Sequence, residues 1–127
     1  MSGSPPTVLF VDDEARILSA LQRSLRREGY RILTAQTPAA ALRLVDEEPV
    51  DVIVSDQKMP GMSGLALLAE VVRRRPSARR LLITGWPEEI PPEQVEALGI
   101  RAVLPKPWDE RELKAILRKE TASDPQP

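Results

Sequence analysis

The sequence predicts an α/β fold, a doubly wound (βα)5 sandwich in which helices cover both faces of a five-stranded parallel sheet. Three short runs, VLFV, VDVIV and LLIT, are almost continuous in aliphatic residues, which is typical of strands buried on both faces. Segments with the apolar spacing of helices alternate with the strand-like runs. Crossover helices of this length favour right-handed βαβ units and therefore a parallel sheet.

Apolar runs and turn signals place the individual elements. The predicted strands are Thr7–Val11, Arg31–Ala35, Val50–Ser55, Arg80–Thr84 and Arg101–Leu104. The predicted helices are Glu14–Glu28, Ala39–Glu47, Leu65–Arg75, Pro91–Leu98 and Glu110–Lys119. Thr37, Ser63 and Asp109 have side chains suited to cap helix starts, and Gly29, Pro49, Pro76 and Gly99 mark helix ends.

The composition limits the chemistry that this chain can perform. Its 127 residues are enough for one domain, and they include no Cys and no His. A thiol nucleophile, an imidazole base and a Cys/His zinc site are therefore excluded. The formal net charge of -1 gives no general argument for binding nucleic acid or a membrane surface.

The domain is predicted to span residues 7–119. The Ser- and Pro-rich segment 1–6 is expected to be a disordered tail, and segment 120–127 either a disordered tail or the start of a linker. The start of the chain lacks the pattern of a signal peptide, and no apolar run approaches the roughly 18–20 residues of a membrane span. A cytoplasmic location is expected.

Polar residues follow four of the predicted strands at the point where each strand ends. Asp12 and Asp13 follow the first strand, Asp56 the third, Thr84 ends the fourth, and Lys106 follows the fifth. Because parallel strands all end at one edge of a sheet, we expect these side chains to converge there. Three carboxylates without His or Cys favour Mg²⁺, while a Lys and a Thr hydroxyl suit the oxygens of a phosphoryl group.

The motifs around these residues resemble the receiver domain of bacterial two-component response regulators. They are VLFVDDE at 8–14, VDVIVSDQKMPGMSG at 50–64, LLITG at 81–85 and VLPKPW at 103–108. The resemblance covers Thr7 to Lys119 and implies a flavodoxin-like receiver fold. Taken singly, the acidic pair is an ordinary helix cap, Lys106 a solvated lysine and Met-Pro-Gly a turn. Their order and shared edge favour the functional interpretation.

The resemblance implies a role for each residue at this edge. Asp56 is expected to be the phosphoacceptor, and Thr84 and Lys106 to contact the phosphoryl group. Asp13 and Asp56 are expected to bind Mg²⁺ directly and Asp12 through water, with the backbone carbonyl of Lys58 as a further ligand. The Lys106-Pro107 peptide is expected to be cis, so Pro107 positions the lysine.

Three positions depart from the pattern of the family. Val103 stands where receivers often have a Tyr or Phe that turns inward when the threonine moves. Trp86 and Trp108 are therefore candidates for coupling, although both suit a packing role. Lys58 is expected to tune phosphoryl hydrolysis through its side chain, and Gly85 to leave room for the phosphoryl group.

The resemblance also implies partners. The donor is expected to be a phosphohistidine on a sensor histidine kinase or a histidine phosphotransfer protein, with Ile17 and Ala20 as docking residues. Ile17 could equally widen the core-facing stripe of its helix. The switching surface is expected to comprise Pro91–Leu98, Arg101–Leu104 and Glu110–Lys119, which could form a homodimer. No direct contact with nucleic acid or a membrane is expected.

Two alternatives stay open at this point. An aspartate-nucleophile phosphatase also uses carboxylates, Mg²⁺, Thr and Lys on an α/β sheet, but its nucleophile usually follows the first strand in a D-x-D arrangement. A receiver-like scaffold that is never phosphorylated is the other. The main prediction is a signalling domain, not a turnover enzyme, that catalyses its own phosphorylation and dephosphorylation.

Overall fold

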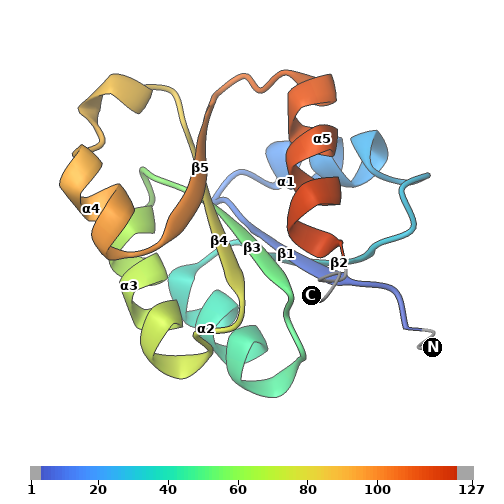
Figure 1. Cartoon of the computed structure of the whole chain (residues 1–127), viewed down its shortest axis with the longest axis horizontal. Helices are drawn as coiled ribbons and strands as arrows, with labels where there is room; N and C mark the ends of the chain where they lie inside the picture. The colour runs from blue at the N-terminus through green and yellow to red at the C-terminus, as the bar shows by residue number, and fades with distance from the viewer. Residues whose placement is uncertain (1–3, 123–127) are drawn as a thin grey trace, which may run out of the picture.

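A computed structural model describes residues 4–122 of the chain (Figure 1). Its strands are β1 (Thr7–Val11), β2 (Arg31–Ala35), β3 (Val52–Asp56), β4 (Arg79–Thr84) and β5 (Ile100–Pro105). Its helices are α1 (Ala15–Ser24), α2 (Pro38–Glu47), α3 (Gly64–Arg74), the 3-10 turn η1 (Pro87–Glu89), α4 (Pro92–Ala97) and α5 (Glu110–Thr121). The strands form one parallel sheet in the order β2-β1-β3-β4-β5, which confirms the predicted fold class.

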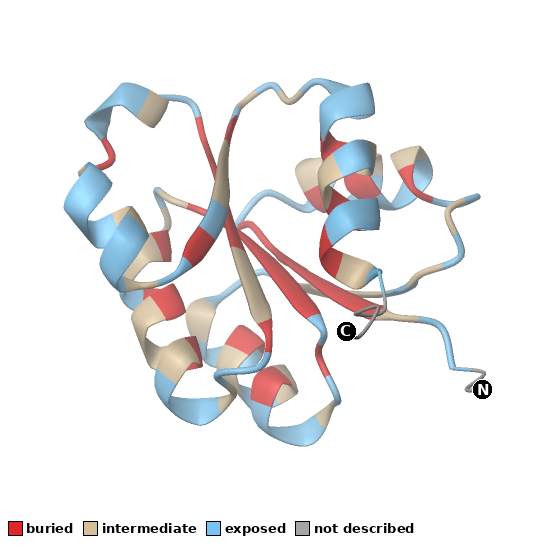
Figure 2. Ribbon diagram, viewed as in Figure 1, coloured by how far each residue is buried: buried red, intermediate tan, exposed pale blue. Residues whose placement is uncertain are grey.

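The sheet separates two hydrophobic clusters, one on each face. Figure 1 shows α1 and α5 on one side of the sheet and α2, α3 and α4 on the other. Successive residues of the central strands β1 and β3 alternate between the clusters, so Leu9 and Ile53 face α2 and α3, whereas Phe10 and Val54 face α1 and α5. The central strands are buried along their length (Figure 2), which explains their continuous apolar runs.

The predicted helix caps at Thr37, Ser63 and Asp109 are confirmed. Each side-chain oxygen accepts a hydrogen bond from the backbone N–H three residues later, at 3.1, 3.1 and 3.0 Å respectively. These bonds satisfy N–H groups that the first turn of a helix leaves without partners.

Two helices are shorter than the sequence predicts. Helix α1 ends at Ser24 instead of Glu28, and the chain continues through turns bonded between residues three apart until Gly29, whose φ is 86°. Leu25 stays buried in that turn, so its apolar spacing extends beyond the regular helix. The fourth predicted helix, Pro91–Leu98, is one residue shorter at each end as the six-residue α4, and η1 is a separate turn before it that the sequence did not predict.

The carboxyl end of α5 lies beyond the predicted boundary at Lys119. Glu120 belongs to the helix and is buried, and its carboxylate accepts hydrogen bonds from Arg79 of β4 at 2.9 Å and Arg101 of β5 at 3.0 Å. The ordered structure therefore includes part of the predicted tail 120–127. Of the two expected tails, residues 4–6 and Ala122 are also described. Residues 1–3 and 123–127 lie outside the described residues.

Between Ser4 and Ala122, the helices are all too short or too polar to cross a membrane.

Gly64 begins α3 at a point where the helix touches the sheet. A Cβ atom there would overlap the carbonyl oxygen of Asp56 and approach Leu82 Cδ1 to 2.8 Å. We expect Gly64→Ala to lower the free energy of unfolding by about 1–3 kcal/mol, because backbone must move to admit the methyl group. Urea unfolding measures this change.

Gly85→Ala is the matched control, because a Cβ atom there would meet only the carbonyl oxygen of Lys106, at 3.8 Å. Equal stability of the two variants would contradict the close approach of α3 to β3.

Candidate functional site

The predicted edge residues do converge. Asp12 and Asp13 follow β1, Asp56 and Thr84 end β3 and β4, and Lys106 follows β5. The three aspartates each offer a carboxylate oxygen within 4.8 Å of the others. Because β1 and β3 are neighbours at the centre of the sheet, the fold holds these like charges together.

A cavity of about 450 Å³ opens at this edge. Its lining residues are Asp13, Glu14, Asp56, Lys58, Thr84, Gly85, Trp86 and Lys106. Asp13 is exposed and Asp56 is buried within the wall. The sequence interpretation did not single out Glu14 as a lining residue, although it belongs to the DDE motif that carried the resemblance.

Lys106 is the cation that pairs with the buried carboxylates. Its Nζ lies 2.8 Å from Asp12 Oδ2 and 3.4 Å from Asp56 Oδ1. Burial by itself would lower the pKa of Lys106, but the hydrogen bond and charge of Asp12, with a smaller contribution from Asp56, outweigh burial and raise the pKa. The peptide before Pro107 is cis, as the resemblance implied.

Asp12 and Asp56 differ in how far their oxygens are engaged. Asp12 Oδ1 accepts from the backbone N–H of Glu14 at 2.9 Å, and its Oδ2 accepts from Lys106. Asp56 lines the cavity, whereas Asp12 does not. Burial and, next, the charge of Asp12 raise the pKa of Asp56, and Lys106 offsets only part of that rise.

The donor set fits Mg²⁺. Three carboxylates supply hard oxygen ligands in close proximity, and the single ammonium of Lys106 leaves excess negative charge among them. Asp13 and Asp56 line the cavity and Asp12 lies beside them, so these three carboxylates could hold the ion.

Thr84 and the first residues of the β4–α4 connection also line the cavity. The buried Thr84 hydroxyl accepts a hydrogen bond from the backbone N–H of Trp86 at 3.1 Å. The exposed Lys58 side chain lies over the Trp86 indole, with Nζ 4.0 Å from the ring centroid. Gly85 also lines the cavity, and a Cβ atom built on it would lie 3.8 Å from the backbone carbonyl oxygen of Lys106.

The remaining predicted residues lie outside the cavity. Val103 is half-buried and packs against the α2–α3 cluster, while Trp108 packs against the α1–α5 cluster. Ile17 packs against that second cluster, in agreement with a core-widening role, and Ala20 is half-buried on the same helix.

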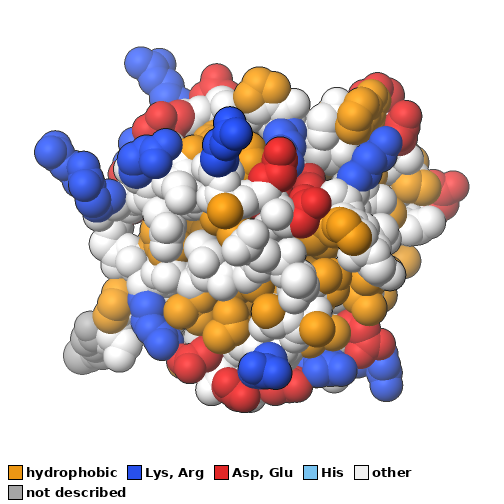
Figure 3. Space-filling model, turned by 180° about the vertical axis from the view of Figure 1, so that it is seen from behind, with side chains coloured by type: hydrophobic (Ala, Val, Ile, Leu, Met, Phe, Trp, Pro, Cys, Tyr) orange, Lys and Arg blue, Asp and Glu red, His pale blue; other side chains and the backbone are white. Residues whose placement is uncertain are grey.

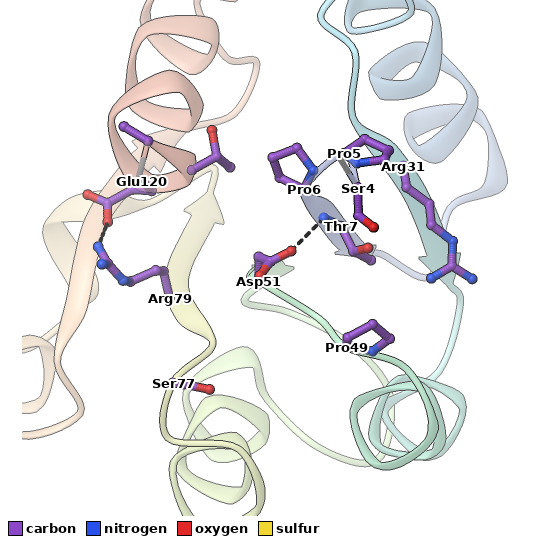
Figure 4. A pocket seen from close by; sticks show the side chains of 12 residues that line it. Ser4, Pro5, Pro6, Thr7, Arg31, Pro49, Asp51, Ser77, Arg79 and Glu120 are labelled. Carbon is purple, nitrogen blue, oxygen red and sulfur yellow. Dashed lines mark hydrogen bonds and ion pairs between the residues drawn. The ribbon is translucent and has the colours of Figure 1, made fainter. Parts of the chain in front are cut away.

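The larger cleft at the amino-terminal edge of the sheet, about 680 Å³, has a different character (Figure 4). Its charged groups already have partners: Arg79 pairs with Glu120, Arg31 with Glu48, and Asp51 accepts the backbone N–H of Thr7 at 2.8 Å. No reactive group is left over among these side chains, so the smaller cavity at the carboxyl edge is the candidate site.

The pKa shift of Asp56 predicts how this site affects stability without metal. A raised pKa means that the folded state disfavours the ionised carboxylate, a cost present at neutral pH and lost as pH falls toward the ordinary value of 3.8. In EDTA at pH 7, Asp56→Asn should therefore raise the melting temperature by about 2–5 °C, with a smaller difference near pH 4.

Differential scanning calorimetry at both pH values makes the comparison, and Mg²⁺ should stabilise the parent chain more than Asp56→Asn. A variant that melts below the parent at pH 7 would show that the pairing with Lys106 outweighs burial.

Known proteins are similar to this chain in sequence and in fold. The sequence model of the response regulator receiver domain matches residues 8–118. The hydrogenase transcriptional regulatory protein HoxA of Cupriavidus necator is 41% identical over 109 residues, which cover 85% of this chain and 22% of HoxA. The chain spans between 13% and about a half of the length of the curated relatives it matches.

Solved structures agree. The signal receiver domain of an HD domain-containing protein from Pseudomonas fluorescens superposes with a TM-score of 0.83 at 32% identity, covering 91% of this chain and 94% of that one. The chemotaxis protein CheY4 of Vibrio cholerae gives a TM-score of 0.80 at 29% identity, covering 91% and 98%. The chain therefore belongs to the response regulator receiver domain family, the phosphoacceptor signalling modules of two-component systems.

Proposed function

We propose that Asp56 accepts a phosphoryl group from a phosphohistidine on a sensor histidine kinase or a histidine phosphotransfer protein. The observation that carries this proposal is that Asp56 is the buried carboxylate that lines the cavity, facing the same space as Thr84 and Lys106. Asp12 is engaged at both oxygens, and Asp13 is exposed beside the entrance. Such a donor suits the cytoplasmic location expected above, which stays a prediction.

The chemistry of transfer follows from the groups around Asp56. A carboxylate oxygen forms a bond to phosphorus while the bond from phosphorus to the donor's imidazole nitrogen breaks, and the nitrogen keeps that electron pair. Lys106 attracts a phosphoryl oxygen. The Thr84 hydroxyl oxygen accepts a hydrogen bond from the Trp86 N–H, so the hydroxyl hydrogen can be donated to another phosphoryl oxygen. Bound Mg²⁺ would offset the negative charge of carboxylates and phosphoryl oxygens.

The proposal extends to dephosphorylation and to the output surface. Water attacking the acyl phosphate would return Asp56 to its free form, at a rate tuned by Lys58 at the entrance. We place the output on α4, β5 and α5, where Ile90, Val95 and Val103 line a hollow of about 550 Å³. A homodimer through that surface is one use of it. No comparison supports a phosphatase or an unphosphorylated scaffold.

Asp56 is tested with a small-molecule donor. With acetyl phosphate and Mg²⁺, intact-mass spectrometry should find one phosphoryl adduct on the parent chain and none on Asp56→Asn. Asp46→Asn, which alters an exposed carboxylate paired with Arg74 on the far face, should be modified like the parent.

An adduct that persists in Asp56→Asn would overturn the assignment. Multiple turnover of a generic phosphate ester would favour the phosphatase, and an unmodified parent chain would favour the scaffold.

Docking of the donor is proposed at Ile17 and Ala20 on α1. Both are half-buried, and exposed arginines lie along the same helix and the turn after it. Figure 3 shows the molecule from behind, with Lys and Arg side chains gathered at the upper left of the view. Ala20→Glu should slow phosphoryl transfer from a histidine kinase about tenfold or more, because a carboxylate would be buried in the contact. Phosphorylation by acetyl phosphate should be unchanged.

Ile17→Glu is expected to act in the same way, although its contact with the core makes a stability measurement necessary. Ser19→Glu, at an exposed position of α1, is the control with the same charge change. Unchanged transfer from the kinase in Ala20→Glu would contradict a docking role, whereas equal loss with both donors would indicate unfolding.

A further inference from the structure

Trp86 is the large hydrophobic side chain most open to solvent within residues 4–122, with 48% of its surface exposed. It belongs to the β4–α4 connection and lines the same cavity as Asp56. The Lys58 ammonium lies 4.0 Å from its ring centroid and 3.9 Å from Glu89 Oε1. We refer to Trp86 and Glu89 together as the Lys58 cradle.

We propose that the Lys58 cradle holds the Lys58 ammonium at the entrance of the cavity, and that a phosphoryl group on Asp56 draws the ammonium away from it. Trp86 is then a positioning residue that acts through Lys58. The exchange rests on the proposed function of Asp56, because the phosphoryl oxygens are the competing partner.

The contacts in the cradle are weak enough to be exchanged. Lys58 and Glu89 side chains are 61% and 58% exposed, and their separation of 3.9 Å is long for an ion pair. A cation–π contact at an exposed site is likewise modest. A phosphoryl group offers nearly two negative charges and three acceptor oxygens, and hydrogen bonds between charged groups are roughly twice as strong as neutral ones.

Release of Lys58 would alter the connection that leads to α4. The indole of Trp86 contacts Lys58, and its backbone N–H donates to the Thr84 hydroxyl at 3.1 Å. Phosphorylation would thus act on both groups that contact Trp86: the ring loses its cation, and the Thr84 hydroxyl, which accepts from the Trp86 N–H, gains an acceptor for its own hydrogen. This exchange provides an aromatic element in the switch where Val103 provides none.

Fluorescence tests the exchange, since the chain has two tryptophans. In a Trp108→Phe background, beryllium fluoride with Mg²⁺ serves as the phosphoryl mimic, and its binding should change the emission of Trp86. Lys58→Met should remove that change while calorimetry still detects binding. Arg73→Met, which removes an exposed cation paired with Glu70 on α3, away from the proposed output surface, is the matched control and should retain it.

A binding cycle tests the competition itself. Because the cradle competes for the ammonium, Trp86→Leu should tighten beryllium fluoride binding by about two- to fivefold, and Trp86→Phe by less. Lys58→Met should weaken binding, and Trp86→Leu should have no further effect in the Lys58→Met background.

The proposal is overturned if Trp86→Leu has the same effect with and without Lys58, or if Lys58→Met leaves the fluorescence change intact. Thermal unfolding of each variant separates these outcomes from misfolding. A parent chain that binds no beryllium fluoride would overturn the role of Asp56 itself and the exchange with it, a result distinct from either of the others.

Discussion

The pairing of Lys106 with two buried carboxylates is the interaction on which the site depends. Asp12 and Asp56 come from neighbouring central strands, and both are removed from water. Lys106 reaches them at 2.8 and 3.4 Å from beyond β5. Without this cation, the sheet would hold like charges together with no compensation, a costly arrangement in a nonpolar surrounding.

The compensation is incomplete, and that incompleteness gives the site its chemistry. Burial and the charge of Asp12 raise the pKa of Asp56, and Lys106 lowers it by less, so the pKa stays above its ordinary value. Two hydrophobic clusters, one on each face of the sheet, supply the stability that offsets this cost. A divalent cation or a phosphoryl group therefore meets side chains that are already placed for it.

Much of this arrangement is visible in the sequence because it follows from local rules. Continuous apolar runs mark the buried strands, and a parallel sheet then forces Asp13, Asp56, Thr84 and Lys106 to one edge. The caps at Thr37 and Ser63 need only the residues around them. These features depend on spacing along the chain.

The features that the sequence did not reveal depend on distant segments. The end of α1 was misplaced because Leu25 remains buried after the regular helix stops. Glu120 appeared to belong to a polar tail, and only the meeting of β4, β5 and α5 shows that Arg79 and Arg101 enclose it. Lys58 and Trp86 are 28 positions apart on different loops, so their contact can be seen only once the paths of both loops are known.

That contact bears on how a receiver can switch with valine at position 103. An aromatic side chain is useful in such a switch because it is large, and a change in its surroundings moves many contacts at once. Trp86 meets this requirement: its backbone N–H donates to the Thr84 hydroxyl, and its ring contacts the Lys58 ammonium. The energy that moves it need only exceed one exposed cation–π contact and one long ion pair, well within what a new dianion supplies. An exposed tryptophan beside the proposed phosphorylation site is therefore better understood as a poised element than as a packing residue. Trp108, packed against the α1–α5 cluster, fulfils the packing role.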